Sequence, residues 1–260
     1  DIERYISMVD SATCAAPEYV KMSMLESILF AFAAPFANHW LRNKRQLTNY
    51  SNRRGPRHLL LIGEGFNGKT TFLRYINWLI SGSHIEPVDA KKFTSQEWTN
   101  LFAHMQTSGT MMPVMVDDIK KRAVQGKTPV LEPFIKSYFE GEWNDKLTYP
   151  LLLGSSNYSI EGDWAKSRVR RLNFDVQFSG NESDEILISN LISTENVAFS
   201  AFSSSYISKL AMGIEYNKDE LHDARIVLEN LYEEAGLKPP NYFPHTLPED
   251  HFDVDAIYCH

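Results

Sequence analysis

The fold is decided by one stretch of the chain, His58-Leu-Leu-Leu-Ile-Gly-Glu-Gly-Phe-Asn-Gly-Lys-Thr-Thr-Phe-Leu73. It reads as a buried strand, a glycine-rich turn and the start of a helix, and it fits the pattern G-x-x-x-x-G-K-[ST] at every fixed position. Glycines in this pattern let backbone N–H groups approach phosphate oxygens where a Cβ would collide. The helix that begins near Gly68 adds the positive end of its dipole. The stretch therefore predicts a nucleoside triphosphate site, and the alternative is a chance glycine turn.

The residues of this loop have separate expected roles. We expect Lys69 to reach the β- and γ-phosphates and the Thr70 hydroxyl to ligate Mg²⁺. ATP and Mg²⁺ are thus the expected cofactors. The predicted nucleotide contacts are Gly63, Glu64, Gly65, Phe66, Asn67, Gly68, Lys69, Thr70 and Thr71.

Two acids end a second apolar run. Asp117 and Asp118 follow Met112-Pro-Val-Met-Val. In a phosphate-loop fold, the strand beside the loop strand ends in an acid that holds Mg²⁺ through water, and a second acid polarises the attacking water. We assign Asp117 to the metal and Asp118 to the water. A strand that merely stops at an Asp-Asp turn is the alternative, which the preceding phosphate loop disfavours.

Polar residues also follow a third apolar run, Tyr149-Pro-Leu-Leu-Leu-Gly-Ser-Ser. Asn157 at its end can orient the lytic water, or it is a turn residue of an Asx motif. Farther on, Arg170 and Arg171 run into an alternating strand up to Phe178. One arginine can neutralise charge on a γ-phosphate, or both are ordinary surface charges.

Composition bounds the class of protein. The chain has 260 residues, 43% of them hydrophobic, which suits one large domain or a domain with appendages. It starts at Asp1 rather than Met, so we expect a fragment or a processed product of a longer protein. Two cysteines suit a reducing compartment, so we expect the cytoplasm or the interior of a host cell. The most apolar run, 25–40, is short and interrupted by polar residues, and no membrane partner is expected.

The net charge of −7 is unevenly placed. Residues 41–58 carry six Lys or Arg and no acid, whereas residues 215–255 carry eleven acids against three bases. The overall acidity therefore does not argue against a nucleic-acid partner for the central part. The basic segment itself is either a phosphate contact or a solvated connector.

Periodicity and turn residues divide the chain into four parts. These are an N-terminal helical segment with a basic linker (1–54), a phosphate-loop core (55–180), a helical region (181–238) and a proline-containing acidic tail (239–260). Pro35 is expected to bend or end the first long helix. The expected strands are 59–62, 84–88, 112–118, 149–157 and 172–178, and the expected helices include 69–81, 130–139, 183–193, 197–212 and 218–235. Residues 89–104 are expected to form a loop and a helix, with Thr94 or Ser95 as the cap and Glu97 three residues after Thr94.

The ordered set of motifs resembles superfamily 3 helicases over roughly residues 55–180. The Asn before Gly-Lys resembles the poxvirus- and phage-type primase–helicases. The resemblance rests on Gly-Glu-Gly-Phe-Asn-Gly-Lys-Thr, Asp117-Asp118, Lys136…Gly141, Ser-Ser-Asn157, Asp163-x-Ala165 and Arg170-Arg171-Leu-x-Phe174.

This resemblance implies an α/β, AAA+-related P-loop core with a parallel sheet of about five strands flanked by helices. It also implies a ring homo-oligomer, often a hexamer, that translocates on single-stranded DNA. By motif matching, Lys69 and Thr70 serve phosphates and Mg²⁺, and Asp117 and Asp118 are the acidic pair. Asn157 is the sensor, and Arg170 or Arg171 acts on a neighbour's nucleotide from the subunit edge.

Two departures from the family pattern matter. Tyr138-Phe-Glu-Gly-Glu-Trp stands where a glycine-rich acidic motif is usual, and Asp118 stands where Glu is common.

We expect the helicase domain of a viral, phage or mobile-element replication protein. The rival is an oligomeric ATP-driven switch, as in a defence system, and a small-molecule kinase is disfavoured. The residues expected to face DNA are Lys120, Lys121, Arg122, Lys127, Lys136 and Lys146.

Overall fold

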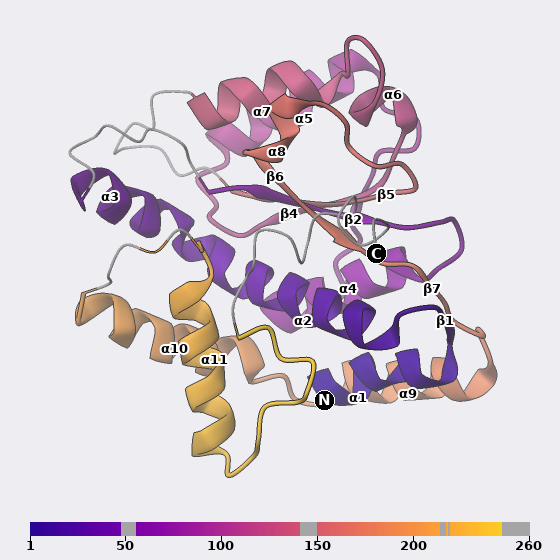
Figure 1. Ribbon diagram of the computed structural model, residues 1–260, viewed down its shortest axis with the longest axis vertical. Helices are drawn as coiled ribbons and strands as arrows, with labels where there is room; N and C mark the ends of the chain where they lie inside the picture. Colours follow the sequence, from indigo (N-terminus) through magenta and orange to yellow (C-terminus); the bar gives the residue numbers. More distant parts are fainter. Residues whose placement is uncertain (48–55, 141–149, 214–216, 218, 246–260) are drawn as a thin grey trace.

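A five-stranded parallel sheet with helices on both faces forms the centre of the computed structural model (Figure 1). The structure describes residues 1–47, 56–140, 150–213, 217 and 219–245. All neighbouring strands in this sheet run parallel, in the order β3-β4-β5-β2-β6. The strands are β2 (His58–Ile62), β3 (Val88–Asp89), β4 (Val114–Ile119), β5 (Leu152–Ser156) and β6 (Val169–Asn173).

Both faces of the sheet are covered, which explains the uninterrupted apolar runs in the sequence. Every residue of β2 and of β5 is buried. A strand covered on both faces has no solvent side and so loses the alternation of polar and apolar residues. The predicted α/β fold with a parallel sheet of about five strands is confirmed.

The strand order corrects one expectation. The acid strand β4 does not lie beside the phosphate-loop strand β2, because β5 pairs with both and separates them. Strand order depends on how the crossover connections run, and no local motif encodes that. Strand β5, which Asn157 follows, is therefore the direct neighbour of both the phosphate-loop strand and the acid strand.

One face of the sheet is covered by helices from the middle and from both ends of the chain. Buried side chains of the central helix α4 pack in one cluster with those of the N-terminal and C-terminal helices. The helices on this side are α1 (Ile2–Ile6), α2 (Pro17–Ala33), α4 (Lys69–Ser81), α9 (Glu182–Ser193), α10 (Ala198–Ala211) and α11 (His222–Glu234). The other face is covered by α5 (Ser95–Thr107), α6 (Lys121–Val124), α7 (Leu131–Glu140) and α8 (Asp163–Lys166).

Helix α2 lies inside the protein. Pro35 falls in a short 3-10 turn, η2 (Ala34–Phe36), that joins α2 to α3 (Ala37–Leu47), as the proline predicted. By length and composition, the run Pro17–Asn43 is apolar enough to cross a membrane, contrary to our sequence-based expectation. In this structure 89% of its most apolar window is buried among other elements, as in a core helix of a folded domain.

Several local predictions are confirmed, and two are corrected. Helix α4 spans 69–81 and ends at Gly82 in the left-handed region, and α5 begins with a capping box of Thr94 and Glu97. The strand expected at 84–88 is instead the short β3. The strand expected at 172–178 is split, because β6 ends at Asn173 and β7 (Val176–Gln177) pairs with β1 (Thr13–Cys14) in a separate sheet.

Candidate phosphate-loop site

The loop between β2 and α4 is packed too closely for side chains at two of its glycines. A Cβ on Gly63 would lie 2.3 Å from the carbonyl oxygen of Phe174. Gly68 has a φ of +79°, and a Cβ there would lie 2.7 Å from the ring of Phe178. Steric fit thus requires glycine at both positions, and the left-handed backbone is a second reason at Gly68.

The backbone of this loop retains hydrogen-bond donors. Within the described residues, the backbone N–H groups of residues 64–68 donate no hydrogen bond. They precede α4, a helix of 13 residues whose N-terminus carries partial positive charge. Free N–H groups at a helix N-terminus match the oxygens of a phosphate.

Lys69 lies folded over this loop. Its Nζ donates to the carbonyl oxygens of Gly63 and Glu64, at 2.8 and 2.6 Å, and to Oδ1 of Asn67 at 2.8 Å. Burial lowers the pKa of the Lys69 ammonium to about 8, although Asp117 and Asp118 act in the opposite direction. The three acceptors satisfy all three donors of the ammonium and keep it at the loop.

Asn67 connects the lysine to Phe174, the residue that follows strand β6. Its side chain is buried, and its amide group donates to the carbonyl oxygen of Phe174 while its oxygen accepts from Lys69. The sequence predicted a nucleotide contact for Asn67. The structure adds that its side chain positions the lysine.

Thr70 and Asp117 meet at the carboxyl end of the sheet. The Thr70 hydroxyl donates to Oδ2 of Asp117 at 2.6 Å, and the Ser155 hydroxyl donates to Oδ1 of the same carboxylate. Thr70, in the first turn of α4, and Asp117, on β4, are therefore in contact although β5 separates β4 from the loop strand β2. Sequence analysis did not assign Ser155, and its position near the polar end of β5 was the available signal.

Asp118 adopts a backbone that is unusual for a non-glycine residue. Its φ is +53°, and the β4–β5 register shifts between Val116 and Ile119. Its carboxylate accepts from Lys120 Nζ, at 2.8 Å to each oxygen. Lys120 was expected to face DNA, and in this structure it forms an ion pair with the acid assigned to the water.

Asn157 lies next to the phosphate loop. A Cβ built on Gly65 would lie 3.6 Å from the side-chain nitrogen of Asn157. Asn157 follows β5 directly and is exposed, so its amide group is accessible at the edge of the site. The structure thus brings the predicted sensor beside the predicted loop.

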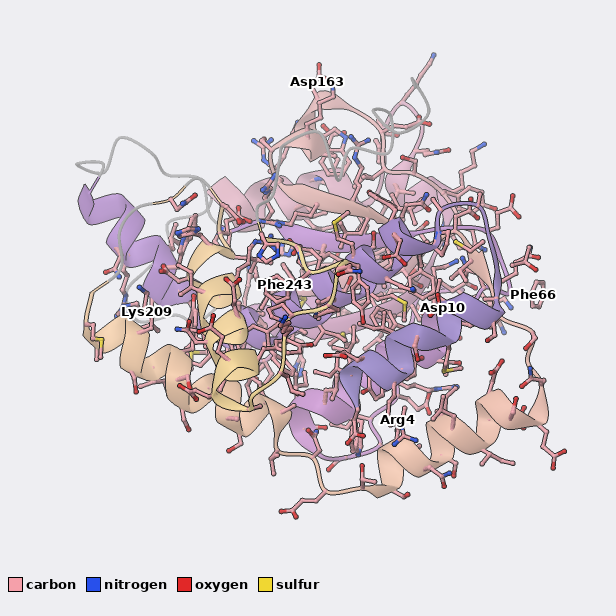
Figure 2. All side chains as sticks on the ribbon, turned by 60° about the horizontal axis from the view of Figure 1, so that its bottom comes forward. Arg4, Asp10, Phe66, Asp163, Lys209 and Phe243 are labelled. Atoms are coloured by element: carbon pink, nitrogen blue, oxygen red, sulfur yellow. The ribbon has the colours of Figure 1, made fainter. Side chains whose placement is uncertain are left out.

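Phe66 stands apart from these groups. Its side chain is fully exposed, with a relative accessibility of 106%, and projects from the molecule in Figure 2. Its φ of +62° is also in the left-handed region. Phe66 can therefore contribute a backbone N–H to the predicted nucleotide site, while its ring faces solvent.

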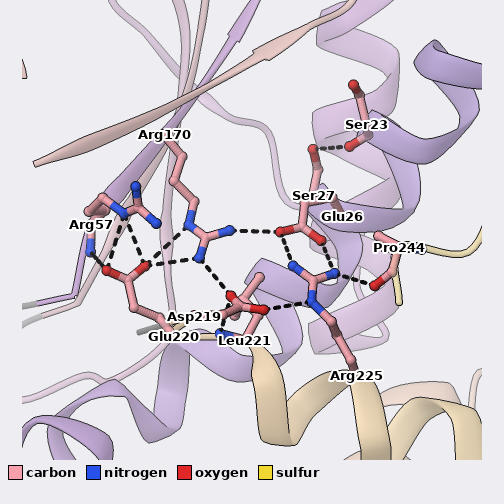
Figure 3. Close-up of polar contacts among 10 residues, drawn as sticks. All are labelled: Ser23, Glu26, Ser27, Arg57, Arg170, Asp219, Glu220, Leu221, Arg225 and Pro244. Carbon is pink, nitrogen blue, oxygen red and sulfur yellow. Dashed lines mark hydrogen bonds and ion pairs between the residues drawn. The ribbon is translucent and has the colours of Figure 1, made fainter. Parts of the chain in front are cut away.

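The structure corrects the expectation for Arg170. This residue was expected at the subunit edge, but its side chain is 2% exposed and lies among acids (Figure 3). Its guanidinium group contacts Glu26 at 2.7 Å and both Asp219 and Glu220 at 3.1 Å. A buried guanidinium group with three carboxylate partners cannot reach a neighbour's nucleotide. The sequence around Arg170 does not predict this burial, because its partners Glu26, Asp219 and Glu220 come from distant segments of the chain.

Arg170 belongs to a buried ionic cluster that joins four parts of the chain. Glu26 on α2 also accepts two hydrogen bonds from Arg225 on α11, at 2.5 and 2.7 Å. Burial acts to raise the pKa of Glu220, but Arg57 and Arg170 lower it overall. We call this group the Glu26 cluster, and its members are Glu26, Arg57, Arg170, Asp219, Glu220 and Arg225.

Arg171 lies on the opposite face of β6 from Arg170, since side chains alternate along a strand. It is partly exposed, and its guanidinium group donates to the carbonyl oxygen of Ile160 at 3.5 Å. That an arginine acts on the nucleotide of a neighbouring subunit therefore stays a prediction for Arg171 alone.

The other basic candidates differ in their surroundings. Arg122 donates to the carbonyl oxygen of Phe93, and Lys136 pairs with Glu132 at 2.6 Å. Lys121 and Lys127 are exposed. Lys146 and Gly141 lie outside the described residues.

A Mg²⁺–nucleotide complex fits this donor set. Thr70 and Asp117 provide the oxygen ligands that Mg²⁺ prefers, and the loop N–H groups complement phosphate oxygens. No group of three or more His, Cys, Asp or Glu suited to a metal occurs in the described part of the chain. Mg²⁺ is usually held by one or two carboxylates together with substrate phosphates, so a fuller protein cage is not required.

Comparisons with known proteins agree with this geometry. The family model for the Aq_aa27 P-loop NTPase domain matches residues 2–160. The solved structure described as "SCCmec type IV Cch - active helicase" has a TM-score of 0.50 and 12% sequence identity, covering 92% of this chain and 48% of that chain. The chain thus spans about half the length of that structure, and at this identity the likeness concerns the fold alone. The comparison with curated proteins finds no match.

Proposed function

The chain belongs to the Aq_aa27 P-loop NTPase domain family, and from this premise we propose that it is a Mg²⁺-dependent ATPase. One observation carries the proposal: Lys69, Thr70 and Asp117 converge beside the free N–H groups of the loop. The lysine serves phosphate, and the hydroxyl and carboxylate serve the metal.

Each residue has a stated task in this reaction. Bound Mg²⁺ and ATP supply the electrophilic γ-phosphate and much of the charge neutralisation. Lys69 would bind phosphate oxygens, and Thr70 and Asp117 would hold the metal. Asn157 orients the attacking water, and Asp118 accepts its proton. Asp118 must first separate from Lys120, whose Nζ lies 2.8 Å from both of its oxygens.

We further propose that this ATPase is the motor of a superfamily 3 type DNA helicase or translocase from a viral, phage or mobile-element replication protein. The motif order around Lys69, Asp117 and Asn157 supports this, as does the fold shared with a structure described as an active helicase. A ring of identical subunits, a hexamer in the simplest case, and single-stranded DNA are the partners that this function requires. The exposed Lys121 and Lys127 are the candidates for phosphate contacts on DNA.

A second candidate function is an oligomeric ATP-driven switch that unwinds nothing. The ion pair between Lys120 and Asp118 favours it, because a paired acid cannot act as a base until another event releases it. The burial of Arg170 also removes one of the two arginines proposed to act between motor subunits.

Phosphate release from Mg·ATP, measured with and without single-stranded DNA, separates the two candidates. A severalfold rise with DNA supports the motor, and hydrolysis that ignores both DNA and RNA supports the switch. A folded protein that releases no more phosphate than its Lys69→Ala variant would contradict both. Mixing inactive Arg171→Ala and Lys69→Ala proteins tests the ring, because a mixed interface restores one intact site.

A further inference from the structure

Two successive acids of β4 face a single residue of β5. Val116 is paired with Gly154, and Ile119 is paired with Ser156. Asp117 and Asp118 therefore lie opposite Ser155 alone, which is the two-against-one arrangement of a β-bulge. The left-handed φ of +53° at Asp118 is part of the same irregularity.

The Ser155 side chain contacts both acids across this bulge. Its hydroxyl donates to Oδ1 of Asp117 and accepts from the backbone N–H of Asp118 at 3.1 Å. Ser155 is fully buried, with a relative accessibility of 0%, so no water replaces these bonds in the folded protein. A hydroxyl group has one proton and two lone pairs, and this one serves both acids at once.

These contacts decide how the Asp117 carboxylate is turned. Because Ser155 holds Oδ1, the second oxygen, Oδ2, faces Thr70 at 2.6 Å. The bond to the Asp118 N–H meanwhile holds the unusual backbone from which the second carboxylate projects. Without the hydroxyl, the Asp117 carboxylate can rotate and the bulge loses a hydrogen bond.

We propose that Ser155 is a positioning residue for the metal–nucleotide site, which holds Asp117 through its carboxylate and Asp118 through its backbone. The inference rests on the proposed Mg²⁺-dependent ATPase function. It assigns β5 a task beyond carrying Asn157, because the central position of β5 places Ser155 between the loop strand and the acid strand.

The chain offers a matched control in the next residue. Ser156 is equally buried, and its hydroxyl donates to the Ile119 carbonyl oxygen at 2.7 Å and accepts from the Tyr158 N–H at 3.0 Å. Ser155→Ala and Ser156→Ala thus each remove two hydrogen bonds from the same strand. Only Ser155→Ala removes bonds to the acids.

The test measures the thermal shift of the protein with ADP as a function of Mg²⁺ concentration, beside the shift with ADP and EDTA. We expect Ser155→Ala to raise the Mg²⁺ concentration at half-maximal shift about 10-fold, the lower end for residues that support metal ligands. Its shift with ADP and EDTA should match wild type, as should both shifts of Ser156→Ala. Ser155→Thr, which keeps the hydroxyl, should restore the wild-type Mg²⁺ dependence.

A double-mutant cycle with Asp117→Asn completes the test. If Ser155 acts through Asp117, Ser155→Ala should change the Mg²⁺ dependence little once Asp117 is Asn. Equal Mg²⁺ dependence in wild type and Ser155→Ala would overturn the inference, as would an equal change in Ser156→Ala. A wild-type protein with no Mg²⁺-dependent shift would instead contradict the proposed function, so the two failures are distinguishable.

Discussion

The phosphate-loop site and the Glu26 cluster use the same kinds of charged residue in opposite ways. At the site, Thr70, Asp117 and Asp118 are partly exposed at the carboxyl end of the sheet, and short sequence motifs predict their roles. In the Glu26 cluster, Glu26 and Arg225 are almost fully buried and come from segments 199 residues apart. Charges that remain accessible can exchange partners with a ligand, whereas charges enclosed with their partners hold segments together.

Of the predicted effects, the largest should be the loss of folding stability when Arg170 is removed. Arg170→Ala leaves Glu26 and Glu220 buried with fewer partners, and breaking a buried pair costs about 3–5 kcal/mol. Chemical denaturation measures the loss in the free energy of unfolding. An Arg170→Ala protein of wild-type stability that fails to hydrolyse ATP would show that the arginine acts at a nucleotide after all.

Removing Lys69 should have a similar free-energy effect, but on turnover. Lys69→Ala deletes the ammonium that we propose binds phosphate, and loss of one such preorganised donor costs about 10²–10³ in rate. The thermal midpoint should stay near that of wild type, because the loop backbone shapes the turn. Steady-state hydrolysis and a melting curve on the same sample check both parts.

Acid should lower the free energy of unfolding, because the buried imidazole of His58 is held neutral in the folded protein. Burial lowers the pKa of His58 to about 4, although Glu220 acts in the opposite direction, and its Nδ1 accepts from the Leu152 N–H. Below the pKa of about 6.5 that a histidine has in the unfolded chain, His58 binds a proton in the unfolded protein but stays neutral in the folded protein. Stability should therefore fall as the pH drops from about 6.5 to 4, by up to about 3 kcal/mol.

Denaturation curves across this pH range measure the effect, and His58→Gln should flatten it. Burial acts to raise the pKa values of Asp219 and Glu220, but their arginine partners lower both overall, so their contribution is lost only as the pH falls below the ordinary carboxyl range. An unchanged slope in His58→Gln would assign the acid sensitivity to another group.

The smallest expected effect concerns the ion pair at the site. Lys120→Ala frees the Asp118 carboxylate, so hydrolysis without nucleic acid should rise a few-fold if the pair restrains Asp118. Lys121→Ala is the matched control, because Lys121 is exposed and adjacent. A loss of hydrolysis in Lys120→Ala would mean that Lys120 assists the reaction instead of restraining it.

The sequence predicted those features of the structure that depend on residues close together in the chain. The loop from Gly63 to Thr70, the limits of α4 and the capping box at Thr94 all depend on residues a few positions apart. The position of β5, the bulge at Asp118 and the burial of Arg170 depend on pairings between distant segments. Ser155 contacts Asp118 across 37 positions, and Arg170 contacts Glu26 across 144, and no local pattern encodes such pairings.

The Glu26 cluster limits how this P-loop NTPase domain can be divided. A fragment of residues 55–180 would keep every motif of the nucleotide site but lose Glu26, Asp219 and Glu220, the carboxylates that enclose Arg170. It would also bare the apolar face on which α2, α10 and α11 pack. A transplanted nucleotide site therefore has to include α2, α10, α11 and the segment that carries Asp219 and Glu220 as well as the motifs.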